Sequence, residues 1–288
     1  MIRSMTGYAR AEAQASWGRI SWELRSVNHR YLDLQFKLPE EFRVLENEMR
    51  AQASAKVGRG KVEAGLRYVR EAAGGNAIQL DVARLQQLKA AVDAVGMEFS
   101  PTTAPDPMRV LGFPGVLKQE EADFAPLVAA AKKLFDQALK DFSDTREREG
   151  ERLAAYLRER CDALDALAAK VRARYPLVRD QWVLKLKARV AELGADLEPQ
   201  RLAQEVAMAA QRLDVEEEMS RLTGHLVEVR QTLVRGESVG RRLDFLMQEF
   251  NREANTMSSK SQDAEMTQCG VEMKVMIEQM REQVQNIE

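Results

Sequence analysis

The spacing of apolar residues changes along this sequence, and the change limits the folds open to the chain. Up to about residue 70, apolar and polar residues alternate in three segments, as at Ile20, Trp22 and Leu24. A period of two places every second side chain on one face of a strand. The predicted half-buried strands cover 20–24, 32–38 and 62–68. From about residue 120 the apolar spacing is three to four, which is typical of helices, so the sequence predicts an α+β fold with the strands first.

Helices and one more strand complete the predicted N-terminal domain. Residues 1–14 add a strand, and apolar spacing predicts amphipathic helices at 42–53 and 80–95. The resulting order of strand, strand, strand, helix, strand, helix is shared by RNA-handling domains of the ribosomal protein S5 domain 2-like type. If only one face of the sheet is covered, the other face presents cations to solvent: Arg19, Arg25, Lys37, Lys61 and Arg67.

Proline and glycine positions divide the chain further. We expect a small N-terminal sheet domain at 1–97, a Pro/Gly-rich linker or hinge at 98–119, a long helical arm at 120–196 and an all-helical C-terminal domain at 197–288. Pro176 is expected to break or kink the arm, and Leu177–Leu193 can then return as the second limb of a hairpin. Breaks at Pro199, at 235–240 and at 258–262 predict three C-terminal helices.

Charge and composition narrow the class of protein. The 43 Lys and Arg against 45 Asp and Glu give a formal net charge of −2, but residues 1–70 hold 13 cationic and 8 anionic residues, so the remainder is acidic. A basic head fits a surface that faces a polyanion, although such small excesses also occur by chance. No run of apolar residues is long enough for a secretory signal or a membrane span, which predicts a cytoplasmic protein. Cys161 and Cys269 lie far apart in helical sequence, which argues against a disulfide framework.

The stretch DVEEEMSRLTGH, residues 214–225, is the most informative for chemistry. At about 100° per residue, a helix places Asp214, Glu218, Arg221 and His225 on one narrow stripe beside an apolar one. Carboxylates and an imidazole at this spacing can bind a divalent cation, or place a general base beside a cationic group. Two structural interpretations compete: Asp214 and Glu217 form a capping-box-like helix start, and Glu218 and Arg221 form an ion pair.

Two further helices repeat the design. Arg242, Glu249 and Glu253 share a stripe beside apolar residues, and Glu278 and Glu282 lie on one face of the last helix. Three antiparallel helices would bring these groups into one groove, although each stripe alone is usually a solvated face. A Gly-rich phosphate loop, a GxSxG elbow and an HExxH motif are all absent, which excludes the commonest nucleotide-driven enzymes, α/β-hydrolases and zincins.

Six strings together resemble the YicC family, bacterial proteins regarded as endoribonucleases. They are SMTGYAR (4–10), ELRSVNHRYLD (23–33), RGKVE (59–63), DVEEEMSRLTGH (214–225), GRRLDFLMQEFNREANTMSSKS (240–261) and REQVQNIE (281–288). The match is specific at both ends of the chain, whereas 70–200 match mainly in length and helical character. In the loop predicted near 258, Ser258 stands where the family commonly has glycine.

The resemblance implies cleavage of single-stranded RNA, dependence on a divalent metal cation such as Mg or Mn, and a ring-like homo-oligomer, a hexamer, that encloses RNA. By position, catalysis is expected from His225, Glu218, Arg221, Glu249, Arg252 and Glu253, with Asn251 in the same cluster. The family motif does not specify the metal ligands; from the donor atoms that they offer, we infer them among Asp214, Glu217, Glu218 and His225. RNA binding is expected from Arg25, Asn28, His29, Arg30, Arg59, Lys61, Asn255 and Lys260.

Alternatives remain open from the residues alone. His225 can act as a metal ligand or as a proton donor, and general catalysis with the ribose 2′-OH as nucleophile would leave a metal as an RNA-folding aid. A non-cleaving RNA-binding or chaperone ring would use the same surfaces. A coiled-coil scaffold would account for the long helices and for the heptad seam of Met273, Ile277, Met280, Val284 and Ile287. That seam and the long helical stripes from 120 to 193 also predict an oligomer, because together they expose more apolar surface than one chain should cover.

Overall fold

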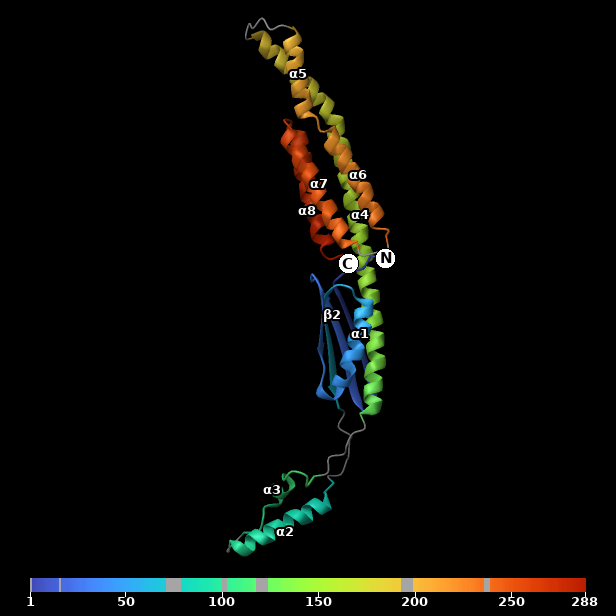
Figure 1. Cartoon of the computed structure of the whole chain (residues 1–288), viewed down its shortest axis with the longest axis vertical. Coiled ribbons are helices and arrows are strands. Elements are labelled where there is room, and N and C mark those ends of the chain that lie inside the picture. The colour runs from blue at the N-terminus through green and yellow to red at the C-terminus, as the bar shows by residue number, and fades with distance from the viewer. Residues whose placement is uncertain are drawn as a thin grey trace.

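A computed structural model describes residues 2–15, 17–70, 79–99, 103–117, 124–192, 199–235 and 239–288. It confirms the predicted α+β class: one small sheet near the N-terminus is followed by long helices (Figure 1). Among the described residues, no helix combines the length and apolar character needed to cross a membrane.

The sheet contains four strands in the order β1-β2-β4-β3. They are β1 (Gly7–Ala15), β2 (Gly18–Val27), β3 (Leu32–Lys37) and β4 (Gly60–Val69). The pairs β1–β2 and β2–β4 are antiparallel. The pair β3–β4 is parallel, because the short helix η1 (Glu40–Leu45) and helix α1 (Glu46–Lys56) form the crossover between these strands. The predicted order of strands and helices is confirmed.

Alternation in the strands produces the first core. Ile20, Trp22 and Leu24 are at most 1% exposed on the covered face of β2. The indole N–H of Trp22 donates to the carbonyl of Ala131 at 2.9 Å, and its ring lies 4.9 Å from that of Phe135. Both partners belong to α4 (Ala125–Glu192), so the first half of this helix covers the sheet together with α1.

Helix α4 is continuous over 68 residues, about 100 Å at a rise of about 1.5 Å per residue, and it passes through Pro176. The predicted hairpin with a return limb at Leu177–Leu193 is therefore wrong. A proline removes one backbone hydrogen bond without necessarily ending a helix that is held from outside. Arg174 binds Asp263 of α8 just before the proline, and Tyr175 and Val178 pack against the core on either side of it.

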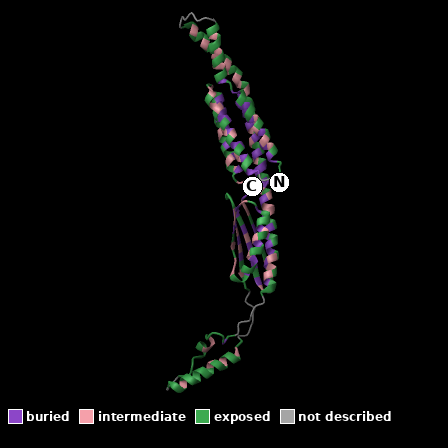
Figure 2. Ribbon diagram, viewed as in Figure 1, coloured by how far each residue is buried: buried purple, intermediate pink, exposed green. Residues whose placement is uncertain are grey.

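Helices α2 (Val82–Glu98) and α3 (Pro107–Leu111) lie beyond the sheet (Figure 1). No residue of α2 is buried, and Figure 2 shows this unit almost entirely exposed. The predicted linker at 98–119 contains α3, while 100–102 and 118–119 lie outside the described residues. The sheet packs directly on α4, so this segment does not act as the expected hinge between the sheet and the helical body.

The second half of α4 packs with the C-terminal helices. These are α5 (Pro199–Leu213), α6 (Glu216–Thr232), α7 (Gly240–Lys260) and α8 (Ala264–Val284). The first of the three predicted helices is thus divided into α5 and α6. The expected loop at 258–262 is shorter than predicted, because Ser258 lies within α7, where its hydroxyl donates to the carbonyl of Ala254 at 2.7 Å.

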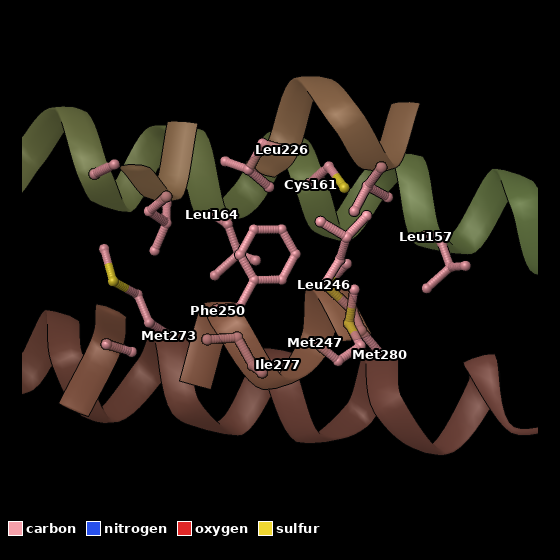
Figure 3. Packing of buried hydrophobic residues seen from close by; sticks show 14 of the residues in the cluster. Leu157, Cys161, Leu164, Leu226, Leu246, Met247, Phe250, Met273, Ile277 and Met280 are labelled. Atoms are coloured by element: carbon pink, nitrogen blue, oxygen red, sulfur yellow. The ribbon is translucent and has the colours of Figure 1, made fainter. Parts of the chain in front are cut away.

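The heptad seam of α8 is covered within the same chain. Met273, Ile277 and Met280 are fully buried against residues of α4 and α7, including Leu164 and Phe250 (Figure 3). The expectation that this seam requires a second copy of the chain is therefore wrong, because α4 and α7 already supply the partner surfaces.

Cys161 and Cys269 are free and buried, and burial raises the pKa of the Cys161 thiol to about 12.

The N- and C-terminal segments meet at the middle of α4, between the two cores. Ser4 forms an isolated bridge with Ile287, and the guanidinium of Arg146 donates to the carbonyl of Ser4 at 2.6 Å and pairs with Glu288. A side chain at Gly150 would place its Cβ 2.1 Å from the carbonyl oxygen of Ile2, so only glycine permits this contact. We refer to these residues as the junction.

Candidate functional site

Helices α6 and α7 bring an imidazole and two carboxylates together. Ligand atoms of His225, Glu249 and Glu253 all lie within 4.8 Å of one another. Glu249 and Glu253 are one turn apart on α7, and His225 faces them from α6. Its ring lies edge-on to Phe250, with the centroids 6.3 Å apart. We call these three residues the His–Glu–Glu group.

Two arginines border the His–Glu–Glu group. Nη1 of Arg221 lies 3.7 Å from Oε1 of Glu253, and Nη1 of Arg252 lies 4.0 Å from Oε2 of Glu249. The Glu253 side chain is only 4% exposed. A nearly buried carboxylate needs a cation or a hydrogen-bond donor beside it, and Arg221 at 3.7 Å offers only part of that compensation. One imidazole nitrogen with carboxylate oxygens is a donor set that suits divalent cations such as Mn²⁺.

The other predicted metal ligands take part in different contacts. Glu218 is 7% exposed, and its Oε1 accepts from Nζ of Lys260 at 2.8 Å. Its Oε2 is buried without a partner among the described residues. Asp214 accepts from the backbone N–H of Glu216 at 2.9 Å, and Glu217 pairs with Arg221 on the surface. Of the four predicted ligands, only His225 belongs to the His–Glu–Glu group.

The competing helix-start interpretation is partly correct. Asp214 does hold a backbone N–H at the start of α6, but Glu217 binds Arg221 instead of reaching back to complete a capping box. The predicted Glu218–Arg221 ion pair is not formed. Lys260, expected to bind RNA, bridges the carboxylate of Glu218 and the carbonyl of Asp214, which ties the end of α7 to the start of α6.

A groove of about 460 Å³ runs between α7 and α8 on the other side of Arg252. We call it the α7–α8 groove; its lining residues are Met247, Gln248, Asn251, Arg252, Asn255, Thr256 and Arg281. Among the predicted residues, Asn251, Arg252 and Asn255 line it. Gln248 and Arg281 were not predicted; the signal for Gln248 was its position one turn before Arg252 and seven residues before Asn255.

A second cleft, of about 760 Å³, lies beside the junction. Asn28, His29, Arg30 and Arg59 line it from the sheet domain, and Arg241 and Asp244 line it from the start of α7. Nε of Arg59 donates to the carbonyl of His29 at 3.1 Å, and the guanidinium of Arg30 lies 5.3 Å from the ring centroid of Tyr31. Four of the predicted RNA-binding residues therefore gather in this junction cleft, together with a helix that the sequence did not associate with them.

Arg25 and Lys61 lie elsewhere, on strands β2 and β4. Arg25 is exposed on the outer face of the sheet, as predicted, but it is opposite Glu63 in the strand register, and Lys61 is opposite Asp33. Arg25 shares a hollow of about 220 Å³ with Glu23, Lys37 and Glu63, in which Lys37 pairs with Glu63 at 3.4 Å. The outer face is thus mixed in charge, not uniformly basic.

The fold and this site define a class of protein: an α+β chain whose helical half holds an imidazole and two carboxylates beside arginines, with polar clefts on either side. Comparison with known proteins specifies the class further. The family model described as endoribonuclease YicC-like, N-terminal region, matches residues 2–155, and the model described as endoribonuclease YicC-like, C-terminal, matches residues 171–288. The chain belongs to the YicC-like endoribonuclease family.

Two curated relatives match this chain along their whole length. A protein named "Probable endoribonuclease YicC" from Haemophilus influenzae is 41% identical over 295 residues, with all of both chains covered. A protein of the same name from Clostridioides difficile is 31% identical over 293 residues, again with full coverage of both chains.

Proposed function

We propose that this protein is an endoribonuclease that cleaves single-stranded RNA at the His–Glu–Glu group with the help of a divalent cation, Mg or Mn. The observation that carries the proposal is the approach of His225, Glu249 and Glu253 to within 4.8 Å of one another. The fold does not require an imidazole and two carboxylates to converge, and among the described residues the nearly buried carboxylate of Glu253 has only Arg221 at 3.7 Å as a cationic partner.

The residues around the group suit cleavage of a phosphodiester. A bound divalent cation supplies positive charge that stabilises the charge developing on the phosphate. Arg221 lies beside Glu253, and Arg252 lies beside Glu249. Each arginine can donate N–H groups to a non-bridging phosphate oxygen. The imidazole of His225 can accept a proton from, or donate one to, the reacting oxygens.

The junction cleft would bind the RNA strand before it reaches the His–Glu–Glu group. Arg30 and Arg59 would pair with phosphates, and His29 and Tyr31 offer rings on which bases can stack. An RNA-binding or chaperone ring without cleavage would use the same cleft but would not need the His–Glu–Glu group.

We test the proposal with labelled single-stranded RNA incubated with and without chelator, followed by readdition of Mg²⁺ or Mn²⁺. His225→Ala and Glu249→Gln should lower single-turnover cleavage by about two orders of magnitude, the usual effect of losing an acid–base or charge-stabilising group. Thermal stability should stay unchanged, because both side chains are half-buried and lie outside the core clusters.

Glu218→Ala provides the matched contrast on the same helix. It leaves Lys260 without its carboxylate, so we expect the unfolding free energy to fall by about 1–3 kcal/mol, with a smaller loss of cleavage than in His225→Ala. A fully active and stable His225→Ala would remove the group from the active site, and cleavage that persists in chelator would contradict the divalent cation. RNA binding without cleavage under any metal would favour the chaperone-like alternative.

The same proposal includes a homo-oligomer, expected as a hexameric ring, in the cytoplasm. Support comes from the α2–α3 unit, where Met97, Phe99 and Met108 are 85%, 71% and 73% exposed. Apolar side chains grouped in this way usually lie in a contact with another molecule. Light scattering should give a multiple of the 32.6 kDa chain mass, and a monomer at micromolar concentrations would contradict the ring.

A further inference from the structure

The lining of the α7–α8 groove differs in charge from the rest of the chain. Its seven residues include Arg252 and Arg281 and no carboxylate, although Asp and Glu outnumber Lys and Arg over the whole sequence. Arg252 and Arg281 each pair with a carboxylate outside the lining, Glu249 at 4.0 Å and Glu278 at 3.5 Å. Their remaining N–H groups suit an anionic ligand in the groove.

Amide groups give the groove a second property. Nδ2 of Asn255 donates to Oδ1 of Asn251 at 3.0 Å, and Nε2 of Gln248 donates to Oδ2 of Asp244 at 3.1 Å. Each amide has two N–H donors and one carbonyl acceptor. Within the described part of the chain, Oε1 of Gln248 and Oδ1 of Asn255 accept no hydrogen bond, and both residues are exposed to solvent. The groove therefore presents donors and acceptors side by side.

Arg281 adds an unused donor at the edge of the groove. Its Nη1 pairs with Glu278 at 3.5 Å, whereas its Nε is buried and has no partner among the described residues. A buried N–H without a partner costs free energy that a ligand oxygen can recover.

The groove connects the two parts of the proposed site. Arg241 and Asp244 in the junction cleft lie on the same face of α7 as Gln248, Asn251 and Asn255, at steps of three or four residues. From Arg241 to Asn255 this face extends about 21 Å at about 1.5 Å per residue, room for roughly six stacked nucleotides at about 3.4 Å each. Arg252 borders both the groove and the His–Glu–Glu group.

We infer that the α7–α8 groove reads the bases of single-stranded RNA: Gln248, Asn251 and Asn255 bond to base edges, and Arg252 and Arg281 hold the phosphates. This inference rests on the proposed function. Amides are suited to this task because one side chain offers both a donor and an acceptor to the edge of an unpaired base. The groove would then select the nucleotides on which the His–Glu–Glu group acts.

The test uses the full chain and fluorescently labelled 12-nucleotide oligo(U), oligo(A) and oligo(C) in chelator, so that binding is measured without cleavage. The variant is Gln248→Ala with Asn255→Ala. Its matched control is Gln231→Ala with Asn47→Ala, which removes one exposed glutamine and one exposed asparagine from outside the groove. Fluorescence anisotropy gives the ratio of dissociation constants among the three oligomers.

We expect the wild type and the control to discriminate among the oligomers by about tenfold or more, the scale of a base contact made by two hydrogen bonds. The groove variant should reduce this ratio to about twofold while keeping its salt dependence. Arg281→Ala should instead weaken binding of all three oligomers and lower the salt slope by roughly 0.7.

Each outcome separates this inference from the proposed function. An unchanged ratio in the groove variant, or equal binding of the three oligomers by the wild type, overturns base reading even if the protein cleaves RNA. A lost ratio in a protein that cleaves with no metal supports the groove and contradicts the divalent cation of the proposed function.

Discussion

The two halves of α4 support different kinds of surface. The first half covers a sheet whose outer face pairs its charges across neighbouring strands: Arg25 is opposite Glu63, and Lys61 is opposite Asp33. The second half belongs to a helical bundle in which like groups collect in stripes, the carboxylates beside His225 and the amides in the α7–α8 groove.

The period of each element explains this difference. A strand alternates its side chains between two faces, so register sets every charge against a neighbour on the next strand. A helix places residues three or four apart on one line, so Glu249 and Glu253 share one stripe of α7, and Gln248, Asn251 and Asn255 share another. Helices therefore gather the chemistry in this molecule, while the sheet contributes mainly at its rim, in the junction cleft.

A substitution in the junction should have the largest effect, because the junction joins the sheet domain to the helical half of the molecule. Arg146 is 1% exposed and paired with Glu288, so Arg146→Leu leaves a carboxylate and the carbonyl of Ser4 without their donor. Among the described residues, the Glu288 carboxylate then keeps only the N–H of Gly58, which donates to its Oε1 at 2.6 Å. We expect a loss of about 3–5 kcal/mol in the free energy of unfolding, as for a buried ion pair with one partner removed. Urea denaturation followed by circular dichroism measures it.

Arg152→Leu is the matched control on the same helix. Its side chain is 80% exposed, and its pairing with Glu149 is on the surface, so the change should stay within about 0.5 kcal/mol. Equal losses in the two variants would show that the junction does not hold the halves together.

The second largest effect should be on RNA binding, which we expect to depend on the cations of the junction cleft and not on those of the outer sheet face. Arg30→Ala with Arg59→Ala removes two cations from the junction cleft, and we expect about tenfold weaker binding of single-stranded RNA, with a salt slope reduced by roughly 1.4 for two lost phosphate contacts. Arg25→Ala with Arg67→Ala removes two cations that stand among carboxylates on the sheet. That pair should change affinity by less than about twofold. The reverse order of effects would move the RNA path to the sheet face.

Much of the fold was predictable from local patterns. Alternation located the strands, and apolar spacing located α1, α7 and α8, because both follow from which residues a single element buries. Pro176 misled the prediction because the contacts of Arg174, Tyr175 and Val178 that keep α4 intact come from elements distant in sequence.

The site was predictable only in part, for the same reason. The sequence identified His225, Glu249 and Glu253, but it grouped His225 with its own helix neighbours Asp214, Glu217 and Glu218. The spacing of residues on one helix cannot indicate which groups of another helix contact them. Lys260 of α7 binds Glu218, and α7 also supplies the two carboxylates beside His225. The role of Arg281 depends on the packing of α7 against α8, which no single stripe reveals.

The smallest expected effect concerns the clasp between α4 and α8 beside Pro176. Asp263 accepts from the backbone N–H of Met266 at 3.0 Å at the start of α8 and binds Arg174 at 3.2 and 2.8 Å. The hydrogen bond from Arg174 holds the pKa of this carboxyl below its ordinary value of 3.8. Asp263→Asn keeps an N-cap acceptor but loses the charge, so we expect it to cost about 1 kcal/mol at pH 7, the upper range for a partly exposed ion pair.

The sign of the pH dependence follows from the lowered pKa. The folded chain keeps Asp263 ionised at a lower pH than the unfolded chain, so its contribution is complete above about pH 5 and is lost as pH falls through the lowered pKa. The difference in unfolding free energy between wild type and Asp263→Asn should therefore be constant from pH 7 to about 5 and shrink below about pH 4. Asp180→Asn, at an exposed pair with Arg179, should show no such dependence. A difference that grows on acidification would contradict the assignment of the lowered pKa of Asp263 to its pairing with Arg174, because that pairing is lost when the carboxyl is protonated.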